Sequence, residues 1–179
     1  MIALEHIKNI WVTWAIKPGS DRATKKICEL ARTYKNLSWT THILELGPGT
    51  WNLTHPLMMI DDVRLSCFEI LESFVDHLRA HYHEHKNIEI YHDGAENMMK
   101  HINPWSIDIV VSTIPMTFLW DDFKPVLESI HSVLKPWGVF ISWQIRSQQN
   151  DAYKAHIWKE IYFDRVWGIQ PILVSAYQK

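Results

Sequence analysis

The stretch THILELGPGTWNLTHPLM, residues 41–58, joins an apolar run to a glycine turn. The apolar residues 42–46 form a candidate strand, and Gly47-Pro48-Gly49 follows it directly, ahead of a predicted helix. In such a turn the first glycine permits the tight bend, and the second lets the backbone approach a ligand closely. The next position where a small residue would be expected holds Trp51. The large ring alters the helix packing or covers the site, while the two backbone amides of the turn still allow binding.

Strand-like and helix-like segments alternate through the rest of the chain. Strands separated by helices of this length are typical of parallel βαβ units whose sheet is covered on both faces, with ligands at the carboxyl ends of the strands. The end, IYFDRVWGIQPILVSAYQK (161–179), has two β-rich runs around a turn too short for a crossover helix, so they must pair antiparallel. The sequence predicts an α/β fold, Rossmann-like and doubly wound, with a mostly parallel sheet and a C-terminal antiparallel hairpin. The candidate strands are 42–46, 64–69, 87–92, 108–112 and 139–144, and the candidate helices are 52–60, 71–85, 95–102 and 120–135.

The overall composition is that of one soluble domain. A chain of 179 residues can bury most of its apolar surface in a single core, and 47% hydrophobic with 21% charged residues is ordinary for a globular protein. Cys28 and Cys67 both lie in apolar contexts, which fits a reducing compartment. Charged residues near the N-terminus interrupt any secretory apolar core, and no apolar run approaches the ~20 residues that span a bilayer. We therefore expect a cytoplasmic protein.

The first 35 residues are basic and amphipathic. They carry seven Lys and Arg against three Asp and Glu, a net charge of +4, although the whole chain has a net charge of −2. One predicted helix places Trp11 and Trp14 on its apolar stripe, and a second covers 22–34. We expect a helical arm or lid, 1–35, ahead of a main domain, 36–179. The basic face is either simply solvated or meets an anionic partner. The apolar stripe either packs as a lid or also attaches to a membrane surface.

Acidic side chains end two further candidate strands beyond the glycine turn. Glu69 ends the second strand, twenty residues beyond Gly49, where a carboxylate can accept both hydroxyls of a ribose. Asp93 ends the third strand, and Glu45 precedes the turn. The alternative for Glu69 is a strand-end carboxylate that faces water and binds no ligand. Three carboxylates around one glycine turn favour S-adenosylmethionine over a nicotinamide cofactor, because Glu45 would crowd a pyrophosphate.

The glycine turn, the three carboxylates and the terminal hairpin together resemble the class I S-adenosylmethionine-dependent methyltransferases. The resemblance implies that Glu45 helps to hold the methionine end and that Asp93 contacts the adenine amino group. That family usually has Gly-Asp-Ala at the third strand, whereas this chain has Asp93-Gly94-Ala95, so the carboxylate stands one residue early. The implied cofactor-binding set is Glu45, Gly47, Gly49, Glu69, Asp93, Gly94, Ala95 and Ser112.

The exit of the fourth strand, DIVVSTIPMTFL (108–119), bears on the methyl acceptor. Enzymes that methylate nucleobase amines usually have Asn or Asp in the first slot and an aromatic ring in the last, whereas Thr113 and Met116 stand there. The segment has neither a polarising amide nor a stacking ring, which disfavours nucleic acid as the substrate.

The same segment resembles that of the bacterial phosphatidylethanolamine N-methyltransferases. The likeness extends over nearly the whole chain, and more distantly to rRNA adenine dimethyltransferases. It implies methyl transfer to a phospholipid headgroup amine by a monomeric, peripheral protein at the inner face of the cell membrane. The alternatives are an rRNA adenine N6-methyltransferase and a cofactor-binding protein without turnover. The segments that carry the likeness are IKNIWVTWAIKPGSDRATKKICELA (7–31), ILELGPGT (43–50), VVSTIPMTFL (110–119), SIHSVLKPWGVFISW (129–143) and PILVSAYQK (171–179).

The catalytic residues are not assigned by the sequence. A lipid ammonium must lose a proton before it accepts a methyl group, and Tyr153, His156 and His6 are weak candidates for the acceptor of that proton. Ser112 and Thr113 are candidates for orienting the amine. The recurrence of His77, His81 and His85 every four residues suggests a metal site, but no carboxylate or thiolate is indicated to complete it, so we expect no metal.

Overall fold

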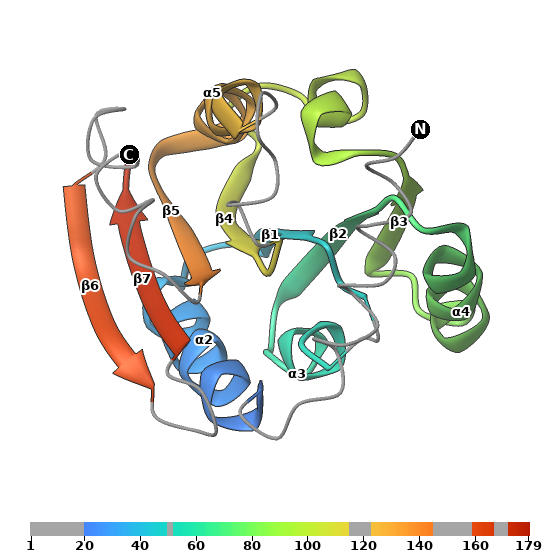
Figure 1. The fold of residues 1–179 in the computed structure, drawn as a ribbon, viewed down its shortest axis with the longest axis horizontal. Helices are drawn as coiled ribbons and strands as arrows, with labels where there is room; N and C mark the ends of the chain where they lie inside the picture. The colour runs from blue at the N-terminus through green and yellow to red at the C-terminus, as the bar shows by residue number, and fades with distance from the viewer. Residues whose placement is uncertain (1–19, 50–51, 115–122, 145–158, 167–171) are drawn as a thin grey trace.

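The computed structural model describes residues 20–49, 52–114, 123–144, 159–166 and 172–179, and the structural statements below concern these residues. They form one seven-stranded sheet with helices on both faces (Figure 1). The strands are β1 (Thr41–Leu46), β2 (Val63–Glu69), β3 (Ile88–His92), β4 (Ile107–Ser112), β5 (Leu134–Gln144), β6 (Lys159–Val166) and β7 (Ile172–Gln178), and the helices are α2 (Ser20–Tyr34), α3 (Thr54–Met58), α4 (Glu72–Tyr82), the 3-10 helix η1 (Ala95–Lys100) and α5 (Phe123–Val133).

The strand order across the sheet is β3-β2-β1-β4-β5-β7-β6. The first five strands are parallel, β7 is antiparallel to β5, and β6 pairs antiparallel with β7 at the outer edge. The predicted fold class, including the C-terminal hairpin, is confirmed. The direction of winding reverses between β1 and β4, so the turn after β1 lies at the switch point where α/β sheets bind ligands.

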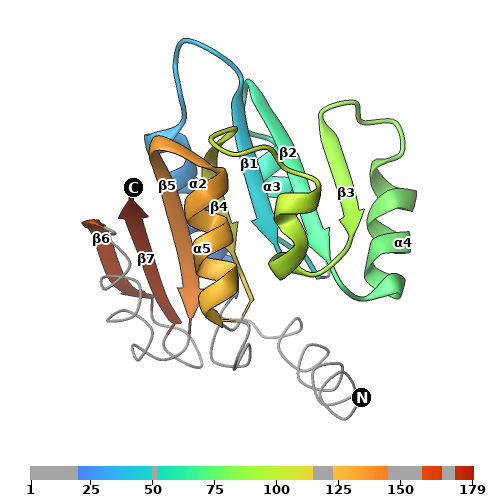
Figure 2. The ribbon, with the colours of Figure 1, turned by 90° about the horizontal axis from the view of Figure 1, so that it is seen from above.

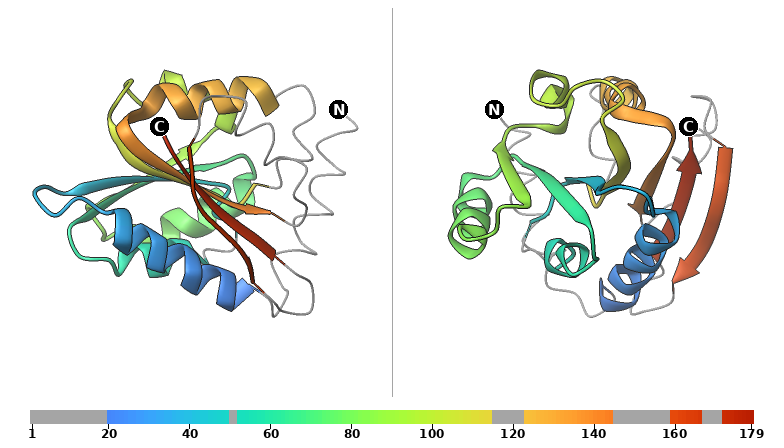
Figure 3. Two further views of the ribbon diagram at one scale, coloured as in Figure 1. Left: turned by 90° about the vertical axis from the view of Figure 1, so that its left-hand side faces the viewer. Right: turned by 180° about the vertical axis from the view of Figure 1, so that it is seen from behind.

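Two apolar layers hold the helices to the sheet, and Figures 2 and 3 show the helices on its two faces. Because side chains alternate along a strand, Ile43 of β1 points to one face and Leu44 to the other. The first face packs against α2, α3 and α4, and the second against α5 and η1. Parallel strands covered on both faces must be apolar throughout, which is why the runs in β1 and β4 are nearly continuous.

The second half of the predicted arm is the helix α2. Its inward residues Ala23, Ile27 and Ala31 are buried against the first face of the sheet, as expected for an amphipathic helix. Trp11 and Trp14 lie outside the described residues. None of the described helices is long and apolar enough to cross a membrane.

Several predicted boundaries differ from the structure, three of them at α4, η1 and β5. The helix α4 ends at Tyr82, where a ring nitrogen of His83 lies 2.9 Å from the carbonyl oxygen of Ala80, so His85 is outside the helix. The segment 95–102 contains a short 3-10 helix. The strand β5 begins at Leu134, five residues before the predicted start, because the Pro136-containing segment continues the pairing with β4 through an irregular register.

Replacing Phe140 by Ala tests the two-layer core. Phe140 is fully buried in β5, and its ring lies 6.2 Å from that of Tyr177. We expect the variant to lose about 3–5 kcal/mol of unfolding free energy in urea titrations, because truncation leaves a cavity. Phe163 of β6, 46% exposed, is the matched control, and its Ala variant should change the free energy by about 0.5 kcal/mol or less. Equal losses of unfolding free energy in the two variants would contradict the assignment of Phe140 to the core and of Phe163 to the surface.

Candidate functional site

The glycine turn after β1 is tied to both neighbouring strands. Gly47 and Gly49 have φ angles of 75° and 54°, a left-handed region that other residues adopt only with strain. The Gly47 amide donates to the carbonyl oxygen of Phe68 in β2 at 2.9 Å. The Thr113 hydroxyl, just after β4, donates to the carbonyl oxygen of Gly47 at 2.6 Å. The turn is therefore held between the carboxyl ends of β2 and β4.

Glu69 lies directly against this turn, as the spacing predicted. Its carboxyl is only 4% exposed; Oε2 accepts a hydrogen bond from the Gly49 amide at 3.1 Å, and Oε1 accepts one from the Leu71 amide at 2.9 Å. Burial raises the pKa of Glu69, and the backbone donors of Leu71 and Gly49 oppose that rise. A carboxylate has about four acceptor positions, so two remain for a ligand's hydroxyl groups.

Glu45 is a fully buried carboxyl on β1, two residues before the turn. Its Oε2 accepts a long hydrogen bond from the Cys67 thiol at 3.5 Å, and its Oε1 has no hydrogen-bond partner among the described residues. Burial raises the pKa of Glu45 to about 7, and the carboxylate of Glu69 adds to the rise, while the neighbouring Thr54 and Cys67 oppose it. A buried acceptor without a partner is unfavourable, so this oxygen suits a ligand that brings a donor or a positive charge.

Asp93 is engaged within its own segment. Its Oδ1 accepts hydrogen bonds from the Gly94 amide and from Asn97 Nδ2, both at 2.8 Å, and its Oδ2 lies 2.8 Å from Nε2 of His101. The contact with His101 has the largest effect in lowering the pKa of Asp93, and those with Asn97 and Gly94 lower it further. Ala95, two residues further, begins η1 and is buried. The carboxylate therefore organises the start of η1, and a ligand's amino group would have to share it.

The sequence did not indicate an aromatic group beside Asp93. The rings of Phe68 and Tyr91 stack with centroids 4.8 Å apart, and the His101 ring lies 5.0 Å from that of Tyr91. Phe68 and Tyr91 are directly paired in β2 and β3. Aligning the two strands in the sequence could therefore have indicated that these rings are neighbours. The group gives the carboxyl edge of β3 an apolar wall.

The candidate catalytic residues have different surroundings. Ser112 ends β4 and is fully buried, and its hydroxyl has no hydrogen-bond partner within the described segments. Thr113 is occupied by its bond to Gly47, so its hydroxyl acts as a tie for the turn. The remaining candidates, and the ring predicted to cover the turn, lie outside the described residues: His6, Trp51, Tyr153 and His156.

The histidines of the α4 region do not form a common helical stripe. His77 and His81 are exposed on α4, and His85 follows the end of that helix. Over the ranges that the structure describes, no group of three side chains is arranged to hold a metal ion.

The titration of Glu45 should appear in the pH dependence of stability. The pKa of Glu45 is about 7 in the folded protein and near 4.3 in an unfolded chain. Its ionisation therefore costs about 4 kcal/mol more in the folded state than in the unfolded state. The free energy of unfolding should therefore fall as pH rises from 4.5 to 7.5. Glu45→Gln removes this group, so its urea-unfolding curves should show a weaker decline over the same range. Parallel declines for the two proteins would contradict a buried, protonatable Glu45.

Comparison of the sequence with family models gives one match. The model described as "Methyltransferase domain" matches residues 43–138, which is more than half of the chain and includes the glycine turn, Glu69 and Asp93. No curated protein sequence matches the chain.

Solved structures with the same fold are numerous but distant in sequence. The N-methyltransferase NodS from Bradyrhizobium japonicum WM9, in complex with S-adenosyl-L-homocysteine, has a TM-score of 0.74 and 12% identity, over 92% of this chain and 89% of that one. The [4+2]-cyclase SpnF has a TM-score of 0.73 and 10% identity, over 86% of this chain and 80% of that one. The CurJ carbon methyltransferase has a TM-score of 0.71 and 12% identity, over 88% of this chain and 53% of that one.

At such identities the structural likeness shows the fold alone, and the presence of a cyclase illustrates that one fold hosts several reactions. The family match adds what the fold cannot, because it covers the segment that carries the glycine turn and its carboxylates. The chain belongs to the methyltransferase domain family, as an enzyme that uses S-adenosylmethionine as its methyl donor.

Proposed function

We propose that the protein is an N-methyltransferase that methylates the headgroup amine of a phospholipid, phosphatidylethanolamine, at a membrane surface. The observation that carries this proposal is a basic, exposed side of α2 at the end of the sheet where the glycine turn lies. The resemblance of the chain to bacterial phosphatidylethanolamine N-methyltransferases supplies the identity of the acceptor.

The residues around the glycine turn fit S-adenosylmethionine, which supplies a methyl group on a positively charged sulfur. The Gly47-Gly49 backbone allows close approach, and Glu69 retains acceptor positions for the ribose hydroxyls. The unpartnered Oε1 of Glu45 suits the ammonium of the methionine end. Asp93, with Gly94 and Ala95, would take the adenine side.

The orientation of α2 follows from its connection to β1. Because α2 ends at Tyr34 and β1 starts at Thr41, the helix runs antiparallel to the strand and begins near the carboxyl edge of the sheet. Arg22 and Lys25 are exposed in its first two turns, together with Asp21, and Lys26 lies 2.7 Å from Glu29. Basic side chains near an anionic leaflet strengthen attachment, each by about fivefold in partitioning.

The chemistry asks the protein mainly to position the amine. Holding two reactants in line can supply about 7–11 kcal/mol of the barrier. A primary ammonium has a pKa near 10.4, so presenting it as the neutral amine at pH 7 costs about 4–5 kcal/mol. The buried hydroxyl of Ser112, at the end of β4, supports a role in orienting the amine. Tyr153 and His156 stay candidates for the proton acceptor.

Of the two rival functions, RNA adenine methylation is disfavoured by the site, whereas binding without turnover has one supporting feature. In RNA adenine methylation, the side chain at the position of Thr113, just after β4, should polarise the exocyclic amine of the base. The Thr113 hydroxyl instead donates to the carbonyl oxygen of Gly47. For binding without turnover, the supporting feature is that Asp93 is already bonded to Gly94, Asn97 and His101. Turnover on vesicles separates both rivals from the proposal.

The acceptor is tested with labelled S-adenosylmethionine and vesicles that contain phosphatidylethanolamine and an anionic lipid. We expect label in the lipid fraction and none in added RNA. Lys25→Glu should lower retention on these vesicles by about fivefold or more, whereas Lys86→Glu, on an exposed site at the opposite edge, should leave it unchanged. Label in RNA, or no label in either acceptor, would overturn the phospholipid proposal.

The cofactor cradle is tested separately by calorimetry with S-adenosylhomocysteine. Glu69→Ala removes the acceptor beside Gly49, so the affinity should fall by at least about tenfold, the effect of losing a charge-assisted hydrogen bond. Glu72→Ala, three residues further and exposed in the first turn of α4, is the control and should bind as the unmodified protein does. If both variants keep full affinity, Glu69 does not hold the cofactor.

A further inference from the structure

Large apolar side chains gather at the amino edge of the sheet, opposite the glycine turn. Trp39 precedes β1, Trp105 precedes β4, and Trp137 lies near the start of β5, and these three strands are neighbours. Their side chains are 55%, 65% and 78% exposed, and Leu37 beside them is 89% exposed. We call these four residues the tryptophan edge. A strand rises about 3.3 Å per residue, so β1 separates this edge from the turn by roughly 25 Å.

The tryptophan edge is held in place by a charged pair. Lys135 Nζ lies 2.8 Å from both carboxylate oxygens of Asp108 and 5.5 Å from the centroid of the Trp39 ring. The indole N–H of Trp39 also donates to Asp108, at 3.4 Å. The second oxygen of Asp108 accepts the His42 amide at 2.9 Å, which ties the pair to β1. The surface around Trp39 is therefore ordered.

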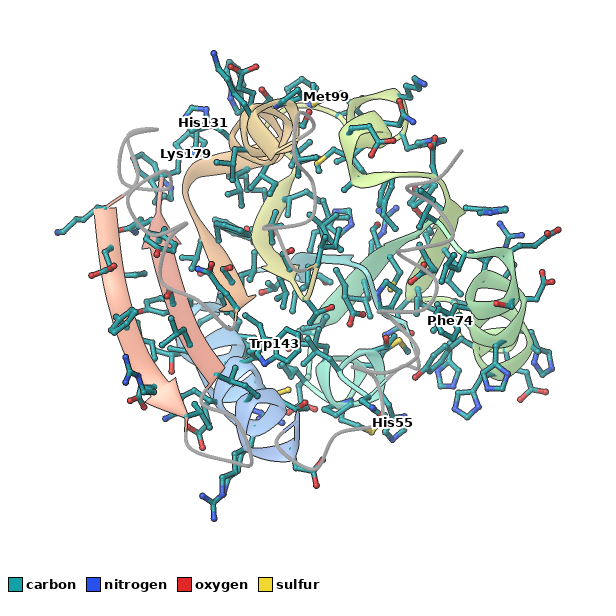
Figure 4. The ribbon with its side chains drawn as sticks, in the orientation of Figure 1. His55, Phe74, Met99, His131, Trp143 and Lys179 are labelled. Atoms are coloured by element: carbon teal, nitrogen blue, oxygen red, sulfur yellow. The ribbon has the colours of Figure 1, made fainter. Side chains whose placement is uncertain are left out.

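The segment that carries Trp137 is anchored from the end of β7. The Nζ of Lys179 donates to the carbonyls of His131 and Leu134, at 2.6 and 2.9 Å, and the Lys179 amide donates to Gly138 at 3.1 Å. Lys179 and His131 are labelled near each other in Figure 4. The backbone on both sides of Trp137 is thus bonded to neighbouring elements, and the exposed ring projects from a well-supported turn.

Two of these tryptophans have a backbone conformation that disfavours them. Trp105 and Trp137 have φ angles of 54° and 62°, in the left-handed region where bulky residues are outliers and glycine is preferred. Neither ring gains the burial that could offset this strain. Exposed rings kept in strained positions point to contact with another molecule, since strained residues persist where function requires them.

The charges at the tryptophan edge favour a partner that is not strongly charged. The loops 36–40, 103–106 and 135–138 contain one charged residue, Lys135, and it is neutralised by Asp108. The edge therefore lacks the basic excess that binds nucleic acid or an anionic leaflet. Two such edges can meet without repulsion between like charges, which would oppose association.

The exposed area suits the centre of a dimer interface. Aromatic side chains bury roughly 150–250 Å² each, so at the exposed fractions given above the three rings could remove on the order of 300–500 Å² from water. A standard interface buries about 800 Å² per partner, and tryptophan is enriched among the residues that dominate binding. The rings would thus supply about half of such an interface, and their surroundings the rest.

We propose that the tryptophan edge is the contact surface between two copies of this chain. The simplest arrangement is a two-fold dimer in which the same edge of each copy meets the other. Both glycine turns then face outward, away from the contact, so each site stays open to its own substrate. This proposal departs from the expectation of a monomer and is independent of the methyl acceptor.

Glycine substitutions provide the test, because glycine removes the ring and also suits the positive φ angles. Sedimentation equilibrium should give twice the 21.2 kDa mass for the unmodified protein. Trp105→Gly and Trp137→Gly should each weaken dimerisation at least about tenfold, with melting temperatures unchanged or raised at protein concentrations where all are monomeric. Trp137→Asn, which also tolerates this conformation, should behave in the same way. Phe163→Ala, an exposed ring on β6, is the control and should remain dimeric.

Affinity for S-adenosylhomocysteine should be unchanged in these variants, because the edge is remote from the turn. A monomer at about 100 µM unmodified protein would overturn the proposal, and so would glycine variants that dimerise normally. Binding of a monomeric protein to phosphatidylcholine vesicles, lost in both glycine variants, would also overturn it and assign the edge to a lipid surface.

Discussion

The contact between the Glu69 carboxyl and the Gly49 amide is the interaction on which the site depends. It joins the ends of β2 and β1, and it forms only because parallel pairing aligns those ends and the positive φ angle of Gly49 turns its amide towards Glu69. Burial raises the pKa of Glu69, and the hydrogen bonds from the Leu71 and Gly49 amides lower it. A ligand that offers hydroxyl groups here meets an acceptor already held in position, so little ordering is needed on binding.

The two edges of the sheet differ in their chemistry. The carboxyl edge has buried carboxyls, a glycine turn with positive φ angles and the first turns of α2, where Arg22 and Lys25 are exposed. The amino edge has exposed tryptophans around a neutral ion pair. Strands of five to eleven residues separate the edges, so a contact at the amino edge leaves the site accessible. The methyltransferase family assignment concerns the first edge, and the proposed dimer concerns the second.

Much of the fold was predictable because its strands are buried on both faces. Short runs that are largely apolar, such as 42–46, have few alternative structures in a chain of this length, and the short link at 168–171 required an antiparallel pair. The approach of Glu69 to Gly49 also followed from spacing. The internal bonds of Asp93 could not be predicted, because they depend on the 3-10 geometry that brings Asn97 and His101 back to it. Nor could the exposure of Trp105 and Trp137, since tryptophan side chains are highly buried on average.

A crystal structure with S-adenosylhomocysteine bound would test the central claim most directly. The account predicts that both ribose hydroxyls lie within hydrogen-bond distance of the Glu69 carboxylate, that the ligand contacts the Gly47–Gly49 backbone, and that its ammonium is paired with Glu45. An adenosine bound elsewhere, with Glu69 still bonded only to the amides of Gly49 and Leu71, would contradict it.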